Sequence, residues 1–423
     1  MLRNPFALVR GLPATVRILV AGTFVNKLGT FVIPFLTIVL KREFHLSSTE
    51  VGALLMAYGA GSLVAILTGG VLTDRLGRRM TLLTSLLGSG ALAVVLAFSP
   101  SIRVFATLLI LFGFVADLYR PAATSIIADL LPSAQRAVGF AALRMAVNLG
   151  FAMGMTIGGL LADWSWRLLF VGDGLTTALF GALVYFFIPE TRPTPVGPEG
   201  PAPSAPRAPS PWRDAVFLQV MAVSFAFALV FFSHITALPL TMTVNAGYPA
   251  RLFGALIGTN GLLIALFEVS IVHRLRGWRR LRVAAVGTAL VGLGFGLSGV
   301  FLHWAWFLVT VVIWTAGEIL STPFKMAFVT DWAPPALRGR YMSLYQATWS
   351  VAVALNPILF LPLQARVGDR TFWPVMMVVA APAVVALLRL DRIADRPERL
   401  RGLAHDPALD AEAGLLAPAP LQG

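Results

Sequence analysis

Long runs of apolar residues alternate with short polar connections along most of the chain. A helix needs about 20 apolar residues to cross the roughly 30 Å hydrocarbon layer of a membrane. Twelve such stretches occur, near residues 14–40, 50–72, 80–98, 103–130, 137–161, 166–188, 214–242, 251–273, 281–300, 303–329, 340–363 and 371–390. The pattern therefore predicts twelve transmembrane helices. The first stretch is too long for a signal peptide and lacks a well-placed cleavage site, so we expect it to be retained.

One proline-rich stretch divides these spans into two sets of six. Residues 189–213 hold nine prolines in 25 residues, which favours an extended, solvated chain. We predict an N-terminal six-helix bundle at 1–188, a Pro-rich cytoplasmic linker at 189–213 and a C-terminal six-helix bundle at 214–390. The polar segment 391–423 is predicted to be a disordered cytoplasmic tail.

The two halves repeat each other at an offset of 202 residues. The sequence VGALL begins at Val51 and FGALI begins at Phe253. The same offset pairs Pro121 with Pro323, Asp129 with Asp331, Pro132 with Pro334 and Arg136 with Arg338. Each half has an even number of spans, so both halves run in the same sense, as in a parallel repeat. The predicted fold is an all-α integral membrane protein of twelve transmembrane helices in two pseudo-symmetric six-helix bundles, with a midplane cavity between them.

Composition and charge support a membrane protein. Hydrophobic residues make up 57% of the chain and charged residues 13%, whereas soluble domains average about 25% charged residues. The absence of cysteine excludes disulfides, thiolate metal sites and cysteine nucleophiles. The net charge of +13 lies mostly in short loops, which indicates membrane orientation and not nucleic-acid binding. With both termini cytoplasmic, 22 basic residues face the cytoplasm and 7 the opposite side, which predicts that topology.

A motif between the second and third spans carries a family resemblance. The segment GGVLTDRLGRR, residues 69–79, resembles the loop signature of the major facilitator superfamily, with Gly70, Asp74, Arg75, Gly77, Arg78 and Arg79 all in place. The resemblance implies that Asp74 engages the start of the eleventh span near Gly339–Arg340. It also implies that Arg78 pairs with Asp129, closing a cytoplasmic gate in the outward-facing state. A solvated turn is the alternative.

The matching loop of the second half, VHRLRGWRR, keeps its basic residues and Gly277 but has no acid. We therefore expect the gate latch on one side only.

The fifth span contains GFAMGMTIGG, residues 150–159, which resembles the fifth-span pattern of the family's antiporters. Gly150, Gly154 and Gly158 share one helix face, followed by Gly159, and small residues let helices approach closely. Met155 stands where the antiporter pattern has proline, so a packing face and a functional hinge both remain open. The segments WSWRLLF and PETR also resemble family signatures. Residues 118–132 and 142–154 look most like bacterial drug:proton antiporters.

Ionisable residues inside the spans are costly in a membrane, so each needs a partner or a cavity. The resemblance implies that the first, fourth, seventh and tenth spans line the cavity. We expect a proton-coupling or substrate cavity formed by Lys27, Asp117, Arg120, Arg144, His234, Glu318 and Lys325. A substrate that binds as a cation favours the charged form of a nearby carboxylate, so the carboxylate loses its proton. Asp117 and Glu318 are the candidates for this proton-exchanging carboxylate.

Static pairs, Asp117–Arg120 and Glu318–Lys325, are the alternative to this exchange. The intramembrane inventory, with Arg144 and Glu268 included, has four basic residues against three acids. Such a basic excess also suits an anionic or zwitterionic substrate.

These observations predict a secondary active transporter that exports small amphipathic compounds or drugs in exchange for protons, without a cofactor. A proton-coupled importer of a nutrient or peptide-like solute is the main alternative, and a non-transporting receptor on the same fold is the third. The sequence GFGLSG at 294–299 lies in a span, not after a strand, so it does not indicate dinucleotide binding. We expect a small-molecule substrate, protons and the lipid bilayer as partners, no nucleic acid or metal, a functional monomer and a bacterial plasma (inner) membrane location.

Overall fold

The computed structural model describes residues 11–191, 210–275, 277–334 and 337–394. Its long helices are α2 (Ala14–Leu28), α3 (Val32–Arg42), α4 (Ser48–Leu76), α5 (Arg78–Ala97), α6 (Ile102–Asp117), α7 (Tyr119–Leu130), α8 (Ser133–Trp164), α9 (Trp166–Phe187), α10 (Ala215–Phe231), α12 (Ala250–Arg274), α13 (Arg280–Leu297), α14 (Trp304–Trp332), α15 (Arg338–Val367) and α16 (Asp369–Ala394). Short helical pieces are η1 (Pro211–Arg213), η2 (Phe232–His234), α11 (Ala237–Leu240) and the π-helix η3 (Thr241–Asn245). Within the described ranges, twelve helical segments are long and apolar enough to cross a membrane, which confirms the predicted number.

Three predicted spans are interrupted and not continuous. The first breaks between α2 and α3, the fourth breaks at Leu118, and the seventh is divided into α10, η2, α11 and η3. Proline explains two of these breaks, because it has no N–H and so cannot donate the helical hydrogen bond to the carbonyl four residues earlier. Pro121 follows the break after Asp117, and Pro239 leaves the carbonyl of Ile235 free. The hydroxyl of Thr37 donates to that carbonyl at 3.3 Å.

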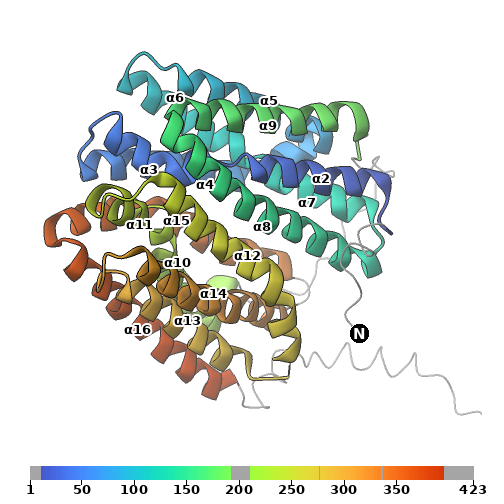
Figure 1. Ribbon diagram of the computed structural model, residues 1–423. Helices are drawn as coiled ribbons and strands as arrows, with labels where there is room; N and C mark the ends of the chain where they lie inside the picture. Colours follow the sequence, from blue (N-terminus) through green and yellow to red (C-terminus); the bar gives the residue numbers. More distant parts are fainter. Residues whose placement is uncertain (1–10, 192–209, 276, 335–336, 395–423) are drawn as a thin grey trace, which may run out of the picture.

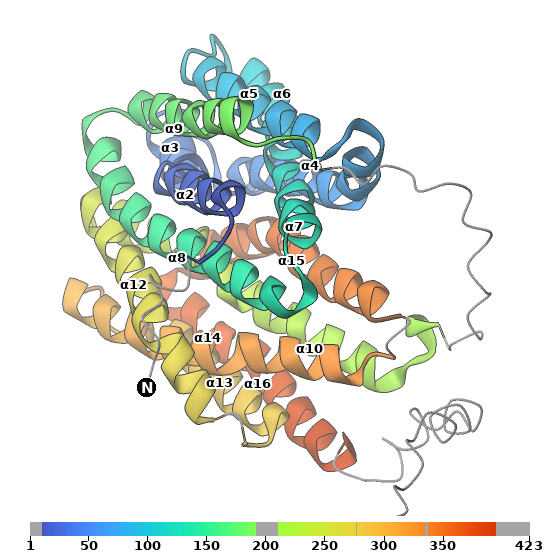
Figure 2. The same ribbon diagram turned by 90° about the vertical axis from the view of Figure 1, so that its right-hand side faces the viewer.

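The helices form two bundles, one above the other in Figure 1. Helices α2 to α9 make the first bundle and α10 to α16 the second. The bundles contact each other through α8 with α12, α4 with α15, and α3 with α11. The view in Figure 2 places the α8–α12 contact on one flank and the α4–α15 contact on the other. Small residues allow this approach, because a Cβ on Gly254 of α12 would lie 2.2 Å from the carbonyl oxygen of Met155.

We call the end with the 43–47, 165 and 246–249 connections the outer end, and the end near Gly77 the inner end. The outer end lies toward the left in Figure 1. There Asp163 at the end of α8 accepts hydrogen bonds from the backbone N–H groups of Ala250 (2.8 Å) and Arg251 (3.2 Å) at the start of α12. The Arg251 guanidinium is also 3.4 Å from this carboxylate. A carboxylate at a helix N-terminus is favourably placed, so this contact ties the two bundles together.

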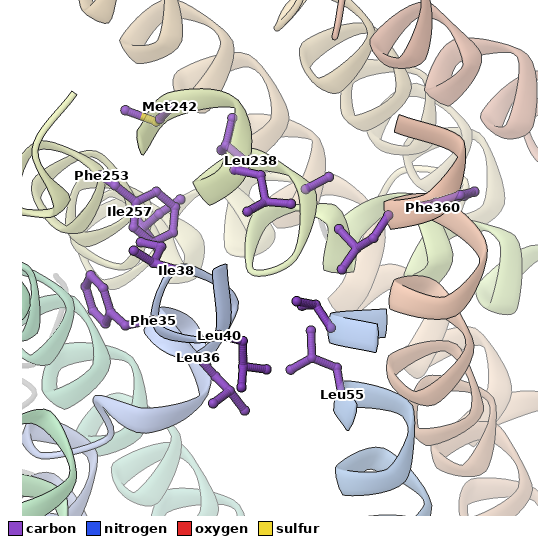
Figure 3. Close-up of a cluster of buried hydrophobic side chains, with 14 of the residues drawn as sticks. Phe35, Leu36, Ile38, Leu40, Leu55, Leu238, Met242, Phe253, Ile257 and Phe360 are labelled. Atoms are coloured by element: carbon purple, nitrogen blue, oxygen red, sulfur yellow. The ribbon is translucent and has the colours of Figure 1, made fainter. Parts of the chain in front are cut away.

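A layer of apolar side chains fills the space between the bundles near the outer end (Figure 3). We call it the outer plug, and its labelled members are Phe35, Leu36, Ile38, Leu40, Leu55, Leu238, Met242, Phe253, Ile257 and Phe360. Each is buried, and the rings of Phe35 and Phe253 meet edge to face with centroids 5.6 Å apart. The plug closes the outer end with residues from both halves.

Candidate functional site: a central cavity

A cavity of about 320 Å³ lies between the bundles, below the outer plug. Both halves of the chain line it. The charged and titratable lining residues are Lys27, Tyr58, Asp117, Tyr119, Arg120, Asp173, His234 and Glu318. Five of the seven residues predicted for this cavity therefore line it, whereas Arg144 and Lys325 do not.

Asp117 and Arg120 form a pair on one wall of this cavity. The Arg120 Nε atom is 2.8 Å from Asp117 Oδ1, as the three-residue spacing allows on a helix. The hydroxyl of Ser62 donates to the other carboxylate oxygen of Asp117. Asp117 is 8% exposed, so a buried carboxylate is matched here by one cation and one hydroxyl donor. The static pair Asp117–Arg120, given above as the alternative to proton exchange, is therefore present.

Asp173 of α9 is a cavity residue that the sequence analysis did not select. Its Oδ2 accepts from the backbone N–H of Val32 at 3.4 Å, and its Oδ1 accepts from the Thr177 hydroxyl at 3.2 Å. Asn26 donates in turn to the Thr177 hydroxyl at 2.9 Å. The signal was available, since Asp173 is an acid inside an apolar span.

Glu318 of α14 has neutral partners. The Asn260 side-chain amide donates to Glu318 Oε2 at 3.0 Å and also to the Thr315 hydroxyl at 3.0 Å. Among the described residues, no cation comes within 4.0 Å of the Glu318 carboxylate. A buried carboxylate with only neutral donors is costly to keep charged, so it suits a group that exchanges a proton.

The static pair Glu318–Lys325, one of the alternatives to proton exchange, does not occur among the described residues. Lys325 is fully buried on the same helix, and its Nζ lies 3.5 Å from the centroid of the Phe227 ring. Its Nζ has no hydrogen-bond acceptor in the described part of the chain. Glu318 and Lys325 lie on the same face of α14, but seven residues, or about 10 Å along a helix, separate them. The two charges are therefore too far apart to pair.

The other predicted cation, Arg144, joins the two bundles outside the cavity. Its guanidinium contacts the carboxylate of Glu268, which places an ion pair between α8 and α12 on the inner side of the small-residue contact. With Arg144, Lys325 and Glu268 removed and Asp173 added, the cavity has three acids, Asp117, Asp173 and Glu318, against Lys27 and Arg120. The expected basic excess is therefore reversed in the cavity itself.

Aromatic groups form the opposite wall. Phe231, Phe232 and His234 line the cavity, and the rings of Phe231 and His234 are 4.6 Å apart. His234 is 6% exposed, and its Nδ1 is 2.6 Å from the carbonyl oxygen of Phe231. On the other side, Lys27 Nζ lies 4.9 Å from the centroid of the Tyr119 ring. The cavity thus offers both charged groups and flat apolar faces to a ligand.

The predicted gate contact between Arg78 and Asp129 is present at the inner end. Arg78 Nε is 3.0 Å from Asp129 Oδ2. Glu190 accepts from the backbone N–H groups of Arg78 (2.9 Å) and Arg79 (3.2 Å), and Arg79 also donates to the Tyr185 carbonyl at 2.6 Å. Gly77 precedes them with φ of +97°, a conformation that disfavours other residues.

Part of the predicted gate lies outside the described side chains. Gly70 and Asp74 belong to α4 and Gly339 to α15, but the surroundings of these three residues are not described. Arg75 is described and exposed. The contact of Asp74 with the start of α15 therefore stays a prediction.

The second half repeats the Arg–Asp pair, so the expectation of a one-sided latch is wrong for this contact. Arg280 pairs with Asp331, and both positions follow from Arg78 and Asp129 by the offset of 202. The expectation failed because it looked for an acid in the loop itself. The partner acid comes instead from the end of α14, a span away in sequence.

The glycines of the fifth span make close helix contacts. A Cβ on Gly150 or Gly154 would lie 2.7 Å from a carbonyl oxygen of α2, and one on Gly158 would lie 2.8 Å from the Phe31 ring. Gly159 faces the other bundle, where a Cβ would lie 2.8 Å from the Ala250 carbonyl oxygen. The packing interpretation of this motif therefore has direct geometric support.

Comparison with known proteins decides the family. The sequence model of the Major Facilitator Superfamily matches residues 19–357. The chain belongs to the Major Facilitator Superfamily. It is therefore a multi-pass membrane transporter and not an enzyme.

Two relatives in this superfamily are similar in sequence to the chain and differ in function. A Na(+), Li(+), K(+)/H(+) antiporter of Planococcus maritimus is 26% identical, over 83% of this chain and 89% of that protein. The quinolone resistance protein NorA of Staphylococcus aureus (strain MRSA252) is 25% identical, over 56% of this chain and 61% of that protein.

Solved structures agree on the superfamily fold. A POT family transporter crystallised with 5-aminolevulinic acid has a TM-score of 0.78 at 16% identity, covering 91% of this chain and 98% of that one. A mutant of the nucleoside transporter NupG has a TM-score of 0.75 at 11% identity, covering 88% of this chain and 99% of that one. At these identities the likeness concerns the fold alone.

Proposed function

We propose that this chain exports small amphipathic compounds in exchange for protons, by alternating access, as a monomer in a bacterial plasma membrane with both termini cytoplasmic. The observation that carries the proposal is Glu318, a cavity carboxylate held only by neutral donors among the described residues. A proton neutralises this group when the cavity is empty of substrate. A bound organic cation makes the charged form favourable and expels the proton.

The composition of the cavity supports a cationic amphipathic substrate over an anionic or zwitterionic one. Its acids outnumber its cations by three to two, and Phe231 and Phe232 provide flat apolar contacts. The alternative hypothesis, an importer of anionic or zwitterionic solutes, depended on an excess of basic residues. The cavity does not have this excess. The two relatives named above, a cation/proton antiporter and a quinolone resistance protein, fit the same proposal.

The closed outer end supports the transport cycle. The outer plug separates the cavity from the outer surface, and the Asp163 contact with α12 holds that end together. Export requires the outer end to open while the inner end closes. The Arg78–Asp129 and Arg280–Asp331 pairs lie at the inner end, each within its own bundle, so each stabilises the inner end of one half during this change.

The test is dye accumulation in an efflux-deficient bacterium that expresses the protein, with ethidium as the probe. We expect lower ethidium accumulation than in cells without the protein, and loss of this difference with an uncoupler. Glu318→Gln should raise accumulation to the level of cells without the protein. Glu43→Gln, an exposed acid in an outer connection, is the matched control and should leave export unchanged. Unchanged accumulation for a panel of cationic dyes, with the protein present in the membrane, would contradict the proposal.

A further inference from the structure

The break in the first span places the start of a helix beside a buried acid. Residues 29–31 separate α2 from α3, so the N–H groups at the start of α3 have no partner one turn earlier in the span. The backbone N–H of Val32, the first residue of α3, donates to Asp173 Oδ2 at 3.4 Å. The positive end of the α3 dipole thus faces a carboxylate from α9.

Asp173 also belongs to a short polar network at this break. Thr177 donates to Asp173 Oδ1 at 3.2 Å, and Asn26 donates to Thr177 at 2.9 Å. All three line the central cavity, and Asp173 itself is only 7% exposed. The carboxylate therefore has a route to the cavity while its two donors come from α3 and α9, and Asn26 of α2 donates to one of them, Thr177.

The charged groups around Asp173 are few. Lys27 of α2 is the nearby cation, and the Asp117–Arg120 pair and Tyr58 stand on the neighbouring cavity wall. The cavity residues contributed by the adjoining helices α5 and α8 are uncharged: Leu86, Ser89, Asn148 and Phe151. No ion pair of 4.0 Å or less to Asp173 exists among the described residues. Its charge is therefore held by dipoles, with one cation nearby.

We propose that Asp173 is a second proton-exchanging residue, located in the N-terminal half, and that its charge controls the outer plug through α3. This inference rests on the proposed proton-coupled transport. The exchange is a simple one, because a cavity water gives a proton to a carboxylate oxygen of Asp173 or takes it back. No other bond forms or breaks.

The link to the plug follows from the position of α3. This helix contributes Phe35, Leu36, Ile38 and Leu40 to the outer plug, and its N-terminus is the part that Asp173 contacts. When Asp173 takes up a proton, the attraction between its charge and the helix dipole is lost. The plug should then open more readily, so protonation and outer opening favour each other, as linkage requires.

The test uses the natural absence of cysteine from the chain. The variant Thr37→Cys places a single thiol at a fully buried position of α3. The purified full-length variant is labelled with a maleimide over a series of pH values, without substrate. Each rate is divided by that of Thr371→Cys, an exposed position at the outer end, to remove the pH dependence of thiol reactivity. We expect the normalised rate to rise several-fold as the pH falls.

Three further variants in the Thr37→Cys background assign this pH dependence. Asp173→Asn should give a flat profile, and Asp173→Glu should restore a pH-dependent one. Thr177→Val removes one hydrogen bond to the charged carboxylate, so the midpoint of the profile should move to higher pH. A purely structural role for Asp173 would alter protein yield or thermal stability without moving that midpoint. If Asp173→Asn does not fold, the Asp173→Glu and Thr177→Val profiles still decide the question.

A flat profile for Thr37→Cys, an unchanged profile in Asp173→Asn, or an unmoved midpoint in Thr177→Val would overturn the inference. The labelling needs no substrate, so its result is independent of ethidium export. Proton-driven export with flat labelling would overturn only the role of Asp173. Asp173-dependent labelling without export of any dye would leave that role supported and overturn the proposed function.

Discussion

Two ion pairs at equivalent positions of the halves differ in their exposure to water. In the Arg78–Asp129 pair the side chains are 12% and 19% exposed, whereas in the Arg280–Asp331 pair they are 39% and 60% exposed. Exposed pairs contribute about 0.2–1 kcal/mol, because water screens them. Breaking a buried pair costs about 3–5 kcal/mol, since it leaves a charge uncompensated. The pair in the first half should therefore matter more.

We predict that Asp129→Asn lowers the free energy of unfolding by about 1–3 kcal/mol, and that Asp331→Asn lowers it by less than about 1 kcal/mol. Asparagine keeps the size of the side chain and removes only its charge. Thermal unfolding of the purified variants measures the difference, and ethidium efflux shows whether each pair also limits the transport rate. Equal losses in the two variants would show that exposure does not set the strength of these pairs.

The charged side chains of the membrane spans could be found in the sequence, but their partners could not. The spacing of Asp117 and Arg120 is short enough that one helix fixes their contact, so that pair was predictable. Lys325 and Glu318 share a helix too, yet each has its contact on another helix, Phe227 and Asn260 respectively. Such contacts depend on how helices are rotated against each other. Apolar patterning does not determine that rotation.

At the scale of elements, hydrophobic patterning predicted where spans lie but not where they break. The interruption after Leu28 and the change from α10 to η2 after Phe231 lie close to equivalent positions at the offset of 202. Each interruption holds only two residues that are not strongly apolar, Gly29 and Thr30 in the first and Ser233 and His234 in the second. A count of apolar residues over about 20 positions therefore does not detect it. Pro121 and Pro239 were the available signals for the other interruptions.

Close packing of α8 on α12 leads to a prediction about one glycine. A Cβ on Gly254 would meet the Met155 carbonyl oxygen at 2.2 Å, so Gly254→Ala must push the two helices apart. Overpacking of this kind costs about 1–3 kcal/mol, and here it weakens the closed outer end. We expect a lower melting temperature and faster maleimide labelling of Thr37→Cys. Gly277→Ala is the control, because a Cβ added at Gly277 would meet no atom within 4 Å beyond its chain neighbours. It should change neither the melting temperature nor the labelling rate.

An unchanged labelling rate in Gly254→Ala would mean that the α8–α12 contact does not hold the outer end closed. The Asp163 contact with the start of α12 would then be the remaining tie on this flank.

For the whole molecule, the number of spans was predictable because each span must bury its backbone hydrogen bonds in a membrane. The conformational state was not. An outward-facing and an inward-facing arrangement use the same residues in the same spans, and the free-energy difference between such states is only a few kcal/mol. The closed outer end depends on contacts such as Phe35 with Phe253, which join the two halves. These contacts cannot be predicted from the residues of either half alone.

Alternating access makes a prediction about distances at the two ends of the molecule. Paired spin labels on Thr49→Cys with Thr371→Cys report the outer end across the halves, and Met80→Cys with His273→Cys report the inner end; all four positions are exposed. If the bundles rock as rigid bodies, lowering the pH or adding ethidium should lengthen the outer distance and shorten the inner one. The pair Thr49→Cys with Arg103→Cys lies within the first bundle, so its distance should stay constant. A change within that bundle as large as the change between bundles would contradict rigid-body rocking. Outer and inner distances that lengthen together would instead indicate separation of the halves, because rocking about a central cavity requires changes of opposite sign.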